Sequence, residues 1–155
     1  MRDRRGFTLI ELLIVVSIIG LLAAIAVPKL MGARGHARAA DVAGSMRVAR
    51  IASTIFYDSA TGWPPTTAAG IVPAGLLGYL PRAGNGIFSG NGWTMAWVQV
   101  SVMVNGVSTI EPTMEVTVTD PQICLPLGNL LGGASATVTI SCDGSGGHVT
   151  QVVER

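Results

Sequence analysis

An apolar run over residues 7–27 constrains the fold of this chain more than any other feature. As an α-helix it would extend roughly 31 Å at about 1.5 Å per residue, close to the thickness of about 30 Å of a bilayer's hydrocarbon core. Several arginines precede the run, and positive charges beside a membrane span favour the cytoplasmic side. We therefore expect residues 7–28 to span a membrane, with the N-terminus in the cytoplasm and the remaining chain outside.

One glutamate, Glu11, interrupts the apolar run near its start. A charged carboxylate in mid-membrane costs about 2.5 to 3.5 kcal/mol on insertion scales. One ordinary interpretation is a cleaved secretory signal that ends at Ala24-Ile25-Ala26, but the apolar part of such a signal usually has about 7 to 15 residues. The other is a plain membrane anchor. Neither interpretation gives a reason for a carboxylate at this position.

The sequence around this glutamate, Gly6-Phe7-Thr8-Leu9-Ile10-Glu11-Leu12-Leu13, resembles the processing motif of type IV prepilins and of the pseudopilins of type II secretion. Residues 5–28 fit this motif throughout: a basic leader, a Gly-Phe junction, the glutamate and a long apolar helix. The resemblance implies that a prepilin peptidase cleaves between Gly6 and Phe7, so that residues 1–6 are a leader. It also implies N-methylation of Phe7 and retention of the apolar segment on the protein.

The same resemblance implies a role for Glu11 in assembly. Cleavage creates an amine at Phe7, and Glu11 lies four residues on, on the same face of the helix. In the family this carboxylate is held to meet the terminal amine of a neighbouring subunit. Two charges in a low-dielectric setting strongly prefer a partner, so a subunit that enters out of register would leave both unpaired.

The helix is expected to continue over residues 29–60 and to pack on a head. Pro28 has no N–H to donate to the carbonyl of Ala24, and with Gly20 it marks a soft section of the helix. The resemblance implies that this section unwinds when subunits pack, and a simple kink is the alternative. Trp63-Pro64-Pro65 predicts that the helix ends near residues 58–62.

One stripe of small and apolar residues at spacings of three and four is expected to face the sheet of the head. Its members are Ala33, Ala37, Ala40, Gly44, Val48, Ile51 and Ile55.

Residues 61–155 are expected to form a small antiparallel β-sheet after a Gly- and Pro-rich loop at 62–92. Alternating patterns predict strands at 97–104, 114–119, 136–142 and 148–153, three or four in all. Asn105-Gly106 predicts a hairpin turn, and Pro112 predicts a bulge or an edge at the start of the return strand. The fold class is α+β, with a long N-terminal helix on an antiparallel sheet.

Two cysteines, Cys124 and Cys142, lie in the head. If the head is outside the cytoplasm, a disulfide is plausible, and its closed loop would contribute roughly 3 kcal/mol in the chain-entropy model. Similar bonds in many type IV pilins pin the C-terminal segment to the sheet. The alternative is a pair of buried free thiols.

The distribution of charge leaves two interpretations open, an attraction between opposite ends of neighbouring copies and a solvated face of the helix. Net charge is +1, but residues 29–58 are basic and the remaining head is mildly acidic, so that opposite ends could attract in an array. His36 and His148 with two separated cysteines do not make a zinc site. Asp120 and Asp143 are thinly spaced for a calcium site. No cofactor, no specific nucleic acid and no enzyme activity are expected.

The sequence as a whole favours a structural subunit of a type IV pilus-like filament, held in the inner membrane before assembly. The resemblance implies contacts with other copies of the chain and other pilins, an inner-membrane platform protein and an assembly ATPase. A type II secretion pseudopilin or a minor pilin is the close alternative. A membrane-anchored periplasmic binding module that never polymerises is the alternative from a different class.

Overall fold

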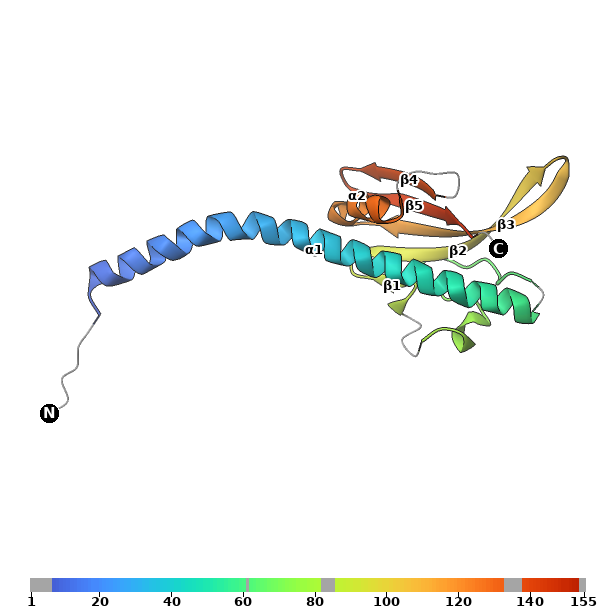
Figure 1. The fold of residues 1–155 in the computed structure, drawn as a ribbon, viewed down its shortest axis with the longest axis horizontal. Coiled ribbons are helices and arrows are strands. Elements are labelled where there is room, and N and C mark those ends of the chain that lie inside the picture. Colours follow the sequence, from blue (N-terminus) through green and yellow to red (C-terminus); the bar gives the residue numbers. More distant parts are fainter. Residues whose placement is uncertain (1–6, 61, 82–85, 133–137, 154–155) are drawn as a thin grey trace. The chain divides into compact units, whose positions relative to one another are not determined.

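The computed structural model describes residues 7–60, 62–81, 86–132 and 138–153. The expected leader, including Gly6, lies outside these residues, as does the predicted start of a strand at Ala136. The chain divides into two compact units, Met1–Arg34 and Gly35–Arg155. Helix α1 (Leu9–Ala60) is continuous from one unit into the other, and its end at Ala60 confirms the predicted stop (Figure 1).

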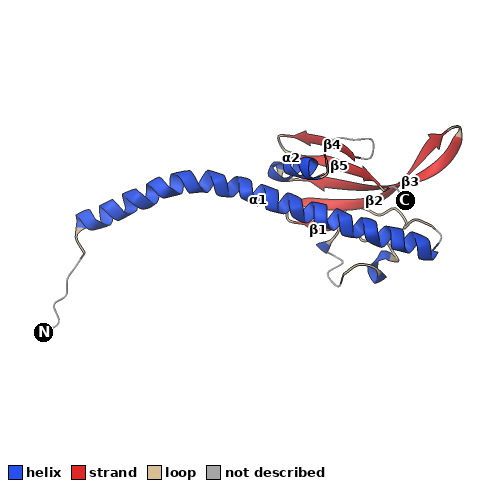
Figure 2. Cartoon of the chain, viewed as in Figure 1, coloured by secondary structure: helices blue, strands red, loops and turns tan. Residues whose placement is uncertain are grey.

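The head in the second unit contains a five-stranded antiparallel sheet in the order β1-β2-β3-β5-β4 (Figure 2). Its strands are β1 (Ser89–Gly90), β2 (Trp93–Val104), β3 (Val107–Val118), β4 (Val138–Asp143) and β5 (Gly146–Val152). The α+β class is therefore confirmed, with one more strand than the sequence predicted. The extra strand is the two-residue β1 at the edge beside β2, too short to leave an alternating pattern.

Asn105-Gly106 forms the predicted turn between β2 and β3. Both residues have positive φ, 53° and 80°, as a type I′ hairpin turn requires. The register then runs unbroken from the pair Val104 and Val107 to the pair Trp93 and Val118. Pro112 lies within this regular register, so it forms no bulge; it stands where the pairing of β3 with β5 begins.

The core lies on one face of the sheet. β2 and β3 turn alternate residues inward, and Trp97, Met95 and Met114 are fully buried there. The indole N–H of Trp97 donates to the carbonyl of Pro64 over 2.9 Å, so the largest buried side chain keeps a hydrogen-bond partner. The loop after α1 follows the outer edge of β2, where its backbone N–H groups donate to the carbonyls of Trp97 and Met95.

The face of α1 that packs on this core is not the predicted one. The buried residues are Gly35, Ala39, Val42, Met46, Ala49, Ala52 and Ser53. The predicted stripe is exposed apart from Val48, which is half-buried. At about 100° per residue the two sets lie on nearly opposite faces of the helix.

Glycine at position 35 permits the close packing at the start of this buried face. A Cβ added to Gly35 would lie 2.6 Å from the carbonyl oxygen of Gln122, so a side chain here would push the two segments apart. The buried face is therefore the one that allows α1 to approach the second helix closely.

That second helix, α2 (Pro121–Leu130), was not predicted. Asp120 caps it: its carboxylate accepts from the N–H of Gln122 over 3.0 Å, and Pro121 opens the first turn. Ile123 and Leu127 bury one side of α2 in the core. Pro126 and Gly128 inside the helix weaken its sequence signal.

Asp120 also forms an ion pair with Arg38, which ties α2 to α1. We expect Asp120→Ala to lower the free energy of unfolding by about 1 to 2 kcal/mol, because both the cap and the ion pair are lost. Arg38→Ala, the matched control, removes only a partly exposed ion pair and should cost at most about 1 kcal/mol. Chemical unfolding followed by circular dichroism measures both. Equal losses in the two variants would contradict a capping role.

Candidate processing and assembly site

The predicted assembly residue, Glu11, lies in the first turn of α1. The hydroxyl of Thr8 donates to Glu11 Oε2 over 3.4 Å, and the backbone N–H of Glu11 donates to Thr8 Oγ1 over 3.3 Å. In this Thr-x-x-Glu arrangement, the threonine hydroxyl provides a hydrogen-bond acceptor for a backbone N–H group in the first turn of the helix. It also holds the carboxylate near the positive end of the helix dipole. Thr8 was not predicted as a site residue, although the Thr8-x-x-Glu11 spacing is itself a capping signal.

Phe7 lies directly before this turn and its side chain is 81% exposed. The structure therefore places Glu11 and the predicted new N-terminus at the same end of α1. Glu11 has no basic ion-pair partner within the described residues. A cation supplied from outside the chain can reach the carboxylate there, since Glu11 is itself exposed.

The surface of α1 in the first unit is apolar and uncovered. Every described residue from 7 to 34 is exposed, and the segment is long and apolar enough to cross a membrane. An apolar surface of this kind is favourable only in contact with lipid or protein. It fits a membrane-anchored precursor.

Gly20 and Pro28, the two residues predicted to soften the helix, both lie inside continuous α1. A side chain at Gly20 would meet no atom within 4 Å, so no packing contact requires glycine there. The helical path through Pro28 leaves the carbonyl of Ala24 without its usual donor.

The predicted disulfide is present: Cys124 of α2 is bonded to Cys142 of β4, with their Cα atoms 5.9 Å apart. The bond fixes α2 to the edge strand of the sheet. Packing is tight around it, because a Cβ at Gly147 would lie 2.6 Å from the sulfur of Cys124. The outcome agrees with the sequence prediction and not with the alternative of two free thiols.

Polar side chains of the head form local hydrogen bonds in a turn or lie on the exposed side of the sheet. Asp143 Oδ1 accepts from the hydroxyl and the backbone N–H of Ser145, over 2.7 and 2.8 Å, and these bonds hold the pKa of that carboxyl below its ordinary value. His148 lies 3.8 Å from Glu115 on the exposed side of the sheet. Within the described part of the chain, no three His, Cys, Asp or Glu residues gather as metal ligands.

Comparison with known proteins agrees with the N-terminal motif. Residues 1–27 match the family described as the prokaryotic N-terminal methylation motif. The type IV narrow pilus major component of Thermus thermophilus is 36% identical over 101 residues, which cover 65% of this chain and 78% of that protein. No solved structure matches the chain.

Two further relatives match over a smaller share of their length. The type IV wide pilus major component of Thermus thermophilus is 60% identical over 37 residues, which cover 24% of this chain and 28% of that protein. The type IV major pilin protein of Myxococcus xanthus is 33% identical over 81 residues, which cover 52% of this chain and 34% of that protein. The match to the narrow pilus component, which extends over most of that protein, together with the N-terminal motif and the α+β fold, places this chain in the type IV pilin family.

Proposed function

We propose that this pilin is a structural subunit that polymerises into a type IV pilus filament and has no enzymatic role. Two observations carry the proposal: the apolar surface of α1 before Gly35 is uncovered, and the head has a core of its own. Because the core of the head includes no described residue before Ala39, the segment is free to bury its surface against other subunits. The names of the relatives as pilus components and major pilins support the same role.

The proposed sequence of events begins in the inner membrane, with the N-terminus in the cytoplasm and the head outside. A prepilin peptidase cleaves between Gly6 and Phe7, and Phe7 is N-methylated. Glu11 then pairs with the terminal amine of an adjacent copy, because both groups would otherwise be unpaired charges in an apolar interior. A platform protein and an assembly ATPase act as partners in moving the subunit from the membrane into the filament.

Gly20 and Pro28 are proposed to let α1 adapt during this transfer. A missing N–H and a residue without a side chain both weaken local helical structure. The exposed second face of α1, which includes Ala37, Gly44 and Ile51, provides further apolar surface for contact between packed helices.

Shearing of cells that express the chain together with a complete pilus assembly system tests the proposal. We expect filaments that contain this protein in the sheared fraction, by electron microscopy with an antibody against the head. The control is the same strain without its assembly ATPase, in which the protein should stay in the membrane fraction. Retention of all of the protein in the membrane when the assembly system is complete would contradict the proposal.

A further inference from the structure

The outer part of the β2–β3 hairpin, residues 100–111, is here called the arm. β5 pairs with β3 only over residues 113–118, and the preceding loop bonds to β2 no further than Gln99, whose N–H donates to Thr66 Oγ1. Neither outer edge of the arm has a strand partner among the described residues. Figure 1 shows the hairpin end extending beyond the other strands of the sheet. A two-stranded ribbon of this kind is marginally stable by itself in water.

The arm is also more apolar than the exposed face of the rest of the sheet. On the sheet face away from α1, the body of the sheet presents polar residues such as Thr117, Glu115 and His148. The same face of the arm instead presents Val100 and Val107, which are 42% and 65% exposed. On the other face Met103 and Ile110 are 68% and 52% exposed. Both faces of the arm therefore offer apolar surface to a partner.

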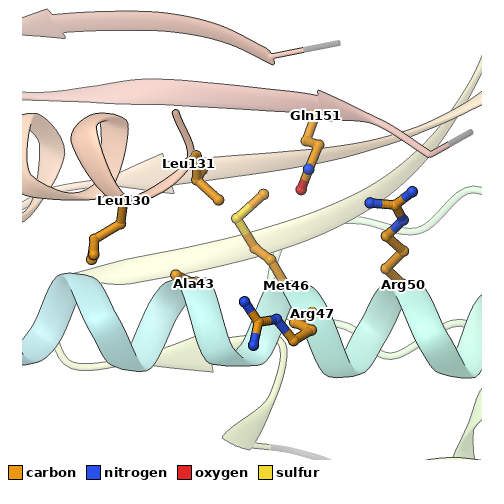
Figure 3. Close-up of a pocket in the computed structure, with 7 residues that line it drawn as sticks. All are labelled: Ala43, Met46, Arg47, Arg50, Leu130, Leu131 and Gln151. Carbon is orange, nitrogen blue, oxygen red and sulfur yellow. The ribbon is translucent and has the colours of Figure 1, made fainter. Parts of the chain in front are cut away.

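A groove lined by apolar and basic side chains lies elsewhere on the same head (Figure 3). It has a volume of about 240 Å³ and lies between α1, the end of α2 and β5. Its apolar lining comes from Ala43, Met46, Leu130 and Leu131, and its polar lining from Arg47, Arg50 and Gln151. The two arginines, one helical turn apart, have no ion-pair partner in the part of the chain that the structure describes.

The charge on the arm complements the charge on the groove. Glu111 is the cross-strand partner of Val100 and lies on the same face of the arm. An arm seated in the groove would place Val107 against the exposed Leu130 and bring Glu111 toward the two unpaired arginines. Opposite charges at such a contact favour one register over others.

An arm cannot fill the groove of its own head. The groove reaches Gln151, which pairs with Met114 on the buried face of the sheet, whereas Val107 and Glu111 lie on the opposite face of β3. The tip of the arm at Val107 also precedes Met114 by seven residues on the same strand. At about 3.4 Å per residue this is a separation of roughly 24 Å. A contact between two different surfaces of identical chains repeats from one copy to the next. It forms a ring if the rotation between neighbouring copies closes, and an open helical array if it does not.

We propose that the arm of one subunit docks in the α1–α2–β5 groove of the next copy of this chain, as a head-to-head contact along the filament. This inference rests on the proposed polymerisation and specifies one contact within it. It uses surfaces of the head alone, so it can fail while the filament still forms through the apolar helices.

Cysteine cross-linking in assembled filaments tests the contact. Val107→Cys and Leu130→Cys, introduced together, should give a ladder of covalent multimers after mild oxidation, because the native cysteines are already bonded to each other. The control pairs Val107→Cys with Leu77→Cys, an exposed position on the short helix η1 (Leu76–Gly78), and should remain monomeric. Cross-linking of the Val107→Cys site to a different protein, or no ladder in filaments that form normally, would overturn the proposal.

A charge exchange gives a second readout. Glu111→Arg alone and the pair Arg47→Glu with Arg50→Glu should each lower filament yield severalfold, because like charges then face each other. All three changes together should restore most of the yield, since the attraction is re-established with opposite signs. Normal filaments from every variant would overturn the arm contact and leave the proposed function standing. Absence of filaments from the unaltered chain under full assembly conditions would instead reject the proposed function, and the arm contact with it.

Discussion

Replacement of Glu11 by glutamine is expected to abolish most filament formation while cleavage and membrane insertion continue. The substitution keeps the size of the side chain and an oxygen that can accept from Thr8, but removes the charge that is proposed to pair with the amine of a neighbouring Phe7. Removal of one partner of a buried charge pair typically costs about 3 to 5 kcal/mol, because the other charge stays buried and unpaired. The measurement is the amount of pilin in the sheared fraction relative to the processed pilin in the membrane.

Thr8→Val is the matched control for this prediction. It removes the hydroxyl that contacts Glu11 but leaves the carboxylate in place, so it should cost only about 1 kcal/mol of helix capping and leave filament yield largely intact. A filament yield from Glu11→Gln equal to that of the unaltered chain would contradict the pairing of Glu11. So would an equal loss from both variants, which would indicate a role in capping instead.

Removal of the disulfide is expected to lower the free energy of unfolding of the head by more than the loss of Asp120. Cys124→Ala with Cys142→Ala opens a loop with a sequence separation of 18, worth about 3 kcal/mol in the chain-entropy model. For a chain of this size, each 1 kcal/mol shifts Tm by about 2 to 4 °C, so we expect a fall of about 6 to 12 °C. Thermal unfolding of the full chain in detergent measures the change.

Reduction of the unaltered protein provides the control for this prediction, and it should lower Tm by a similar amount without any change in sequence. Alkylation of the unreduced protein should modify no thiol. Two alkylated thiols before reduction, or an unchanged Tm in the double variant, would contradict a stabilising bond between α2 and β4.

Features that depend on local sequence were predictable. The turn at Asn105-Gly106 needs residues that tolerate positive φ, and the stop of α1 near Ala60 follows from the prolines after it. The two cysteines left one possible intramolecular pairing, so the bond itself was the only open question, and the structure contains it. The roles of Gly6, Phe7, Glu11, Gly20 and Pro28 in processing and assembly stay predictions.

Features that depend on long-range contacts were not predictable. Small and apolar residues line both faces of α1 beyond Gly35, so periodicity alone favoured the stripe with Ala37 and Ile51, which is exposed. The buried face includes Gly35, which packs closely against Gln122 at the start of a helix that the sequence did not reveal, and Val42 and Met46, which join the core. Asp120-Pro121 is a valid start signal for that helix, but the proline at position 126 inside it is atypical of a helix interior.

The retention of the apolar segment after trimming is the claim on which the assembly account depends, and the mass of the mature protein tests it most directly. Mass spectrometry of the intact pilin from the membrane or from filaments, with sequencing of its N-terminal peptide, gives both the first residue and its modification. The account predicts a chain that begins at Phe7 and carries one methyl group on its terminal amine. A mature chain that begins at Val27, without the apolar segment, would contradict it.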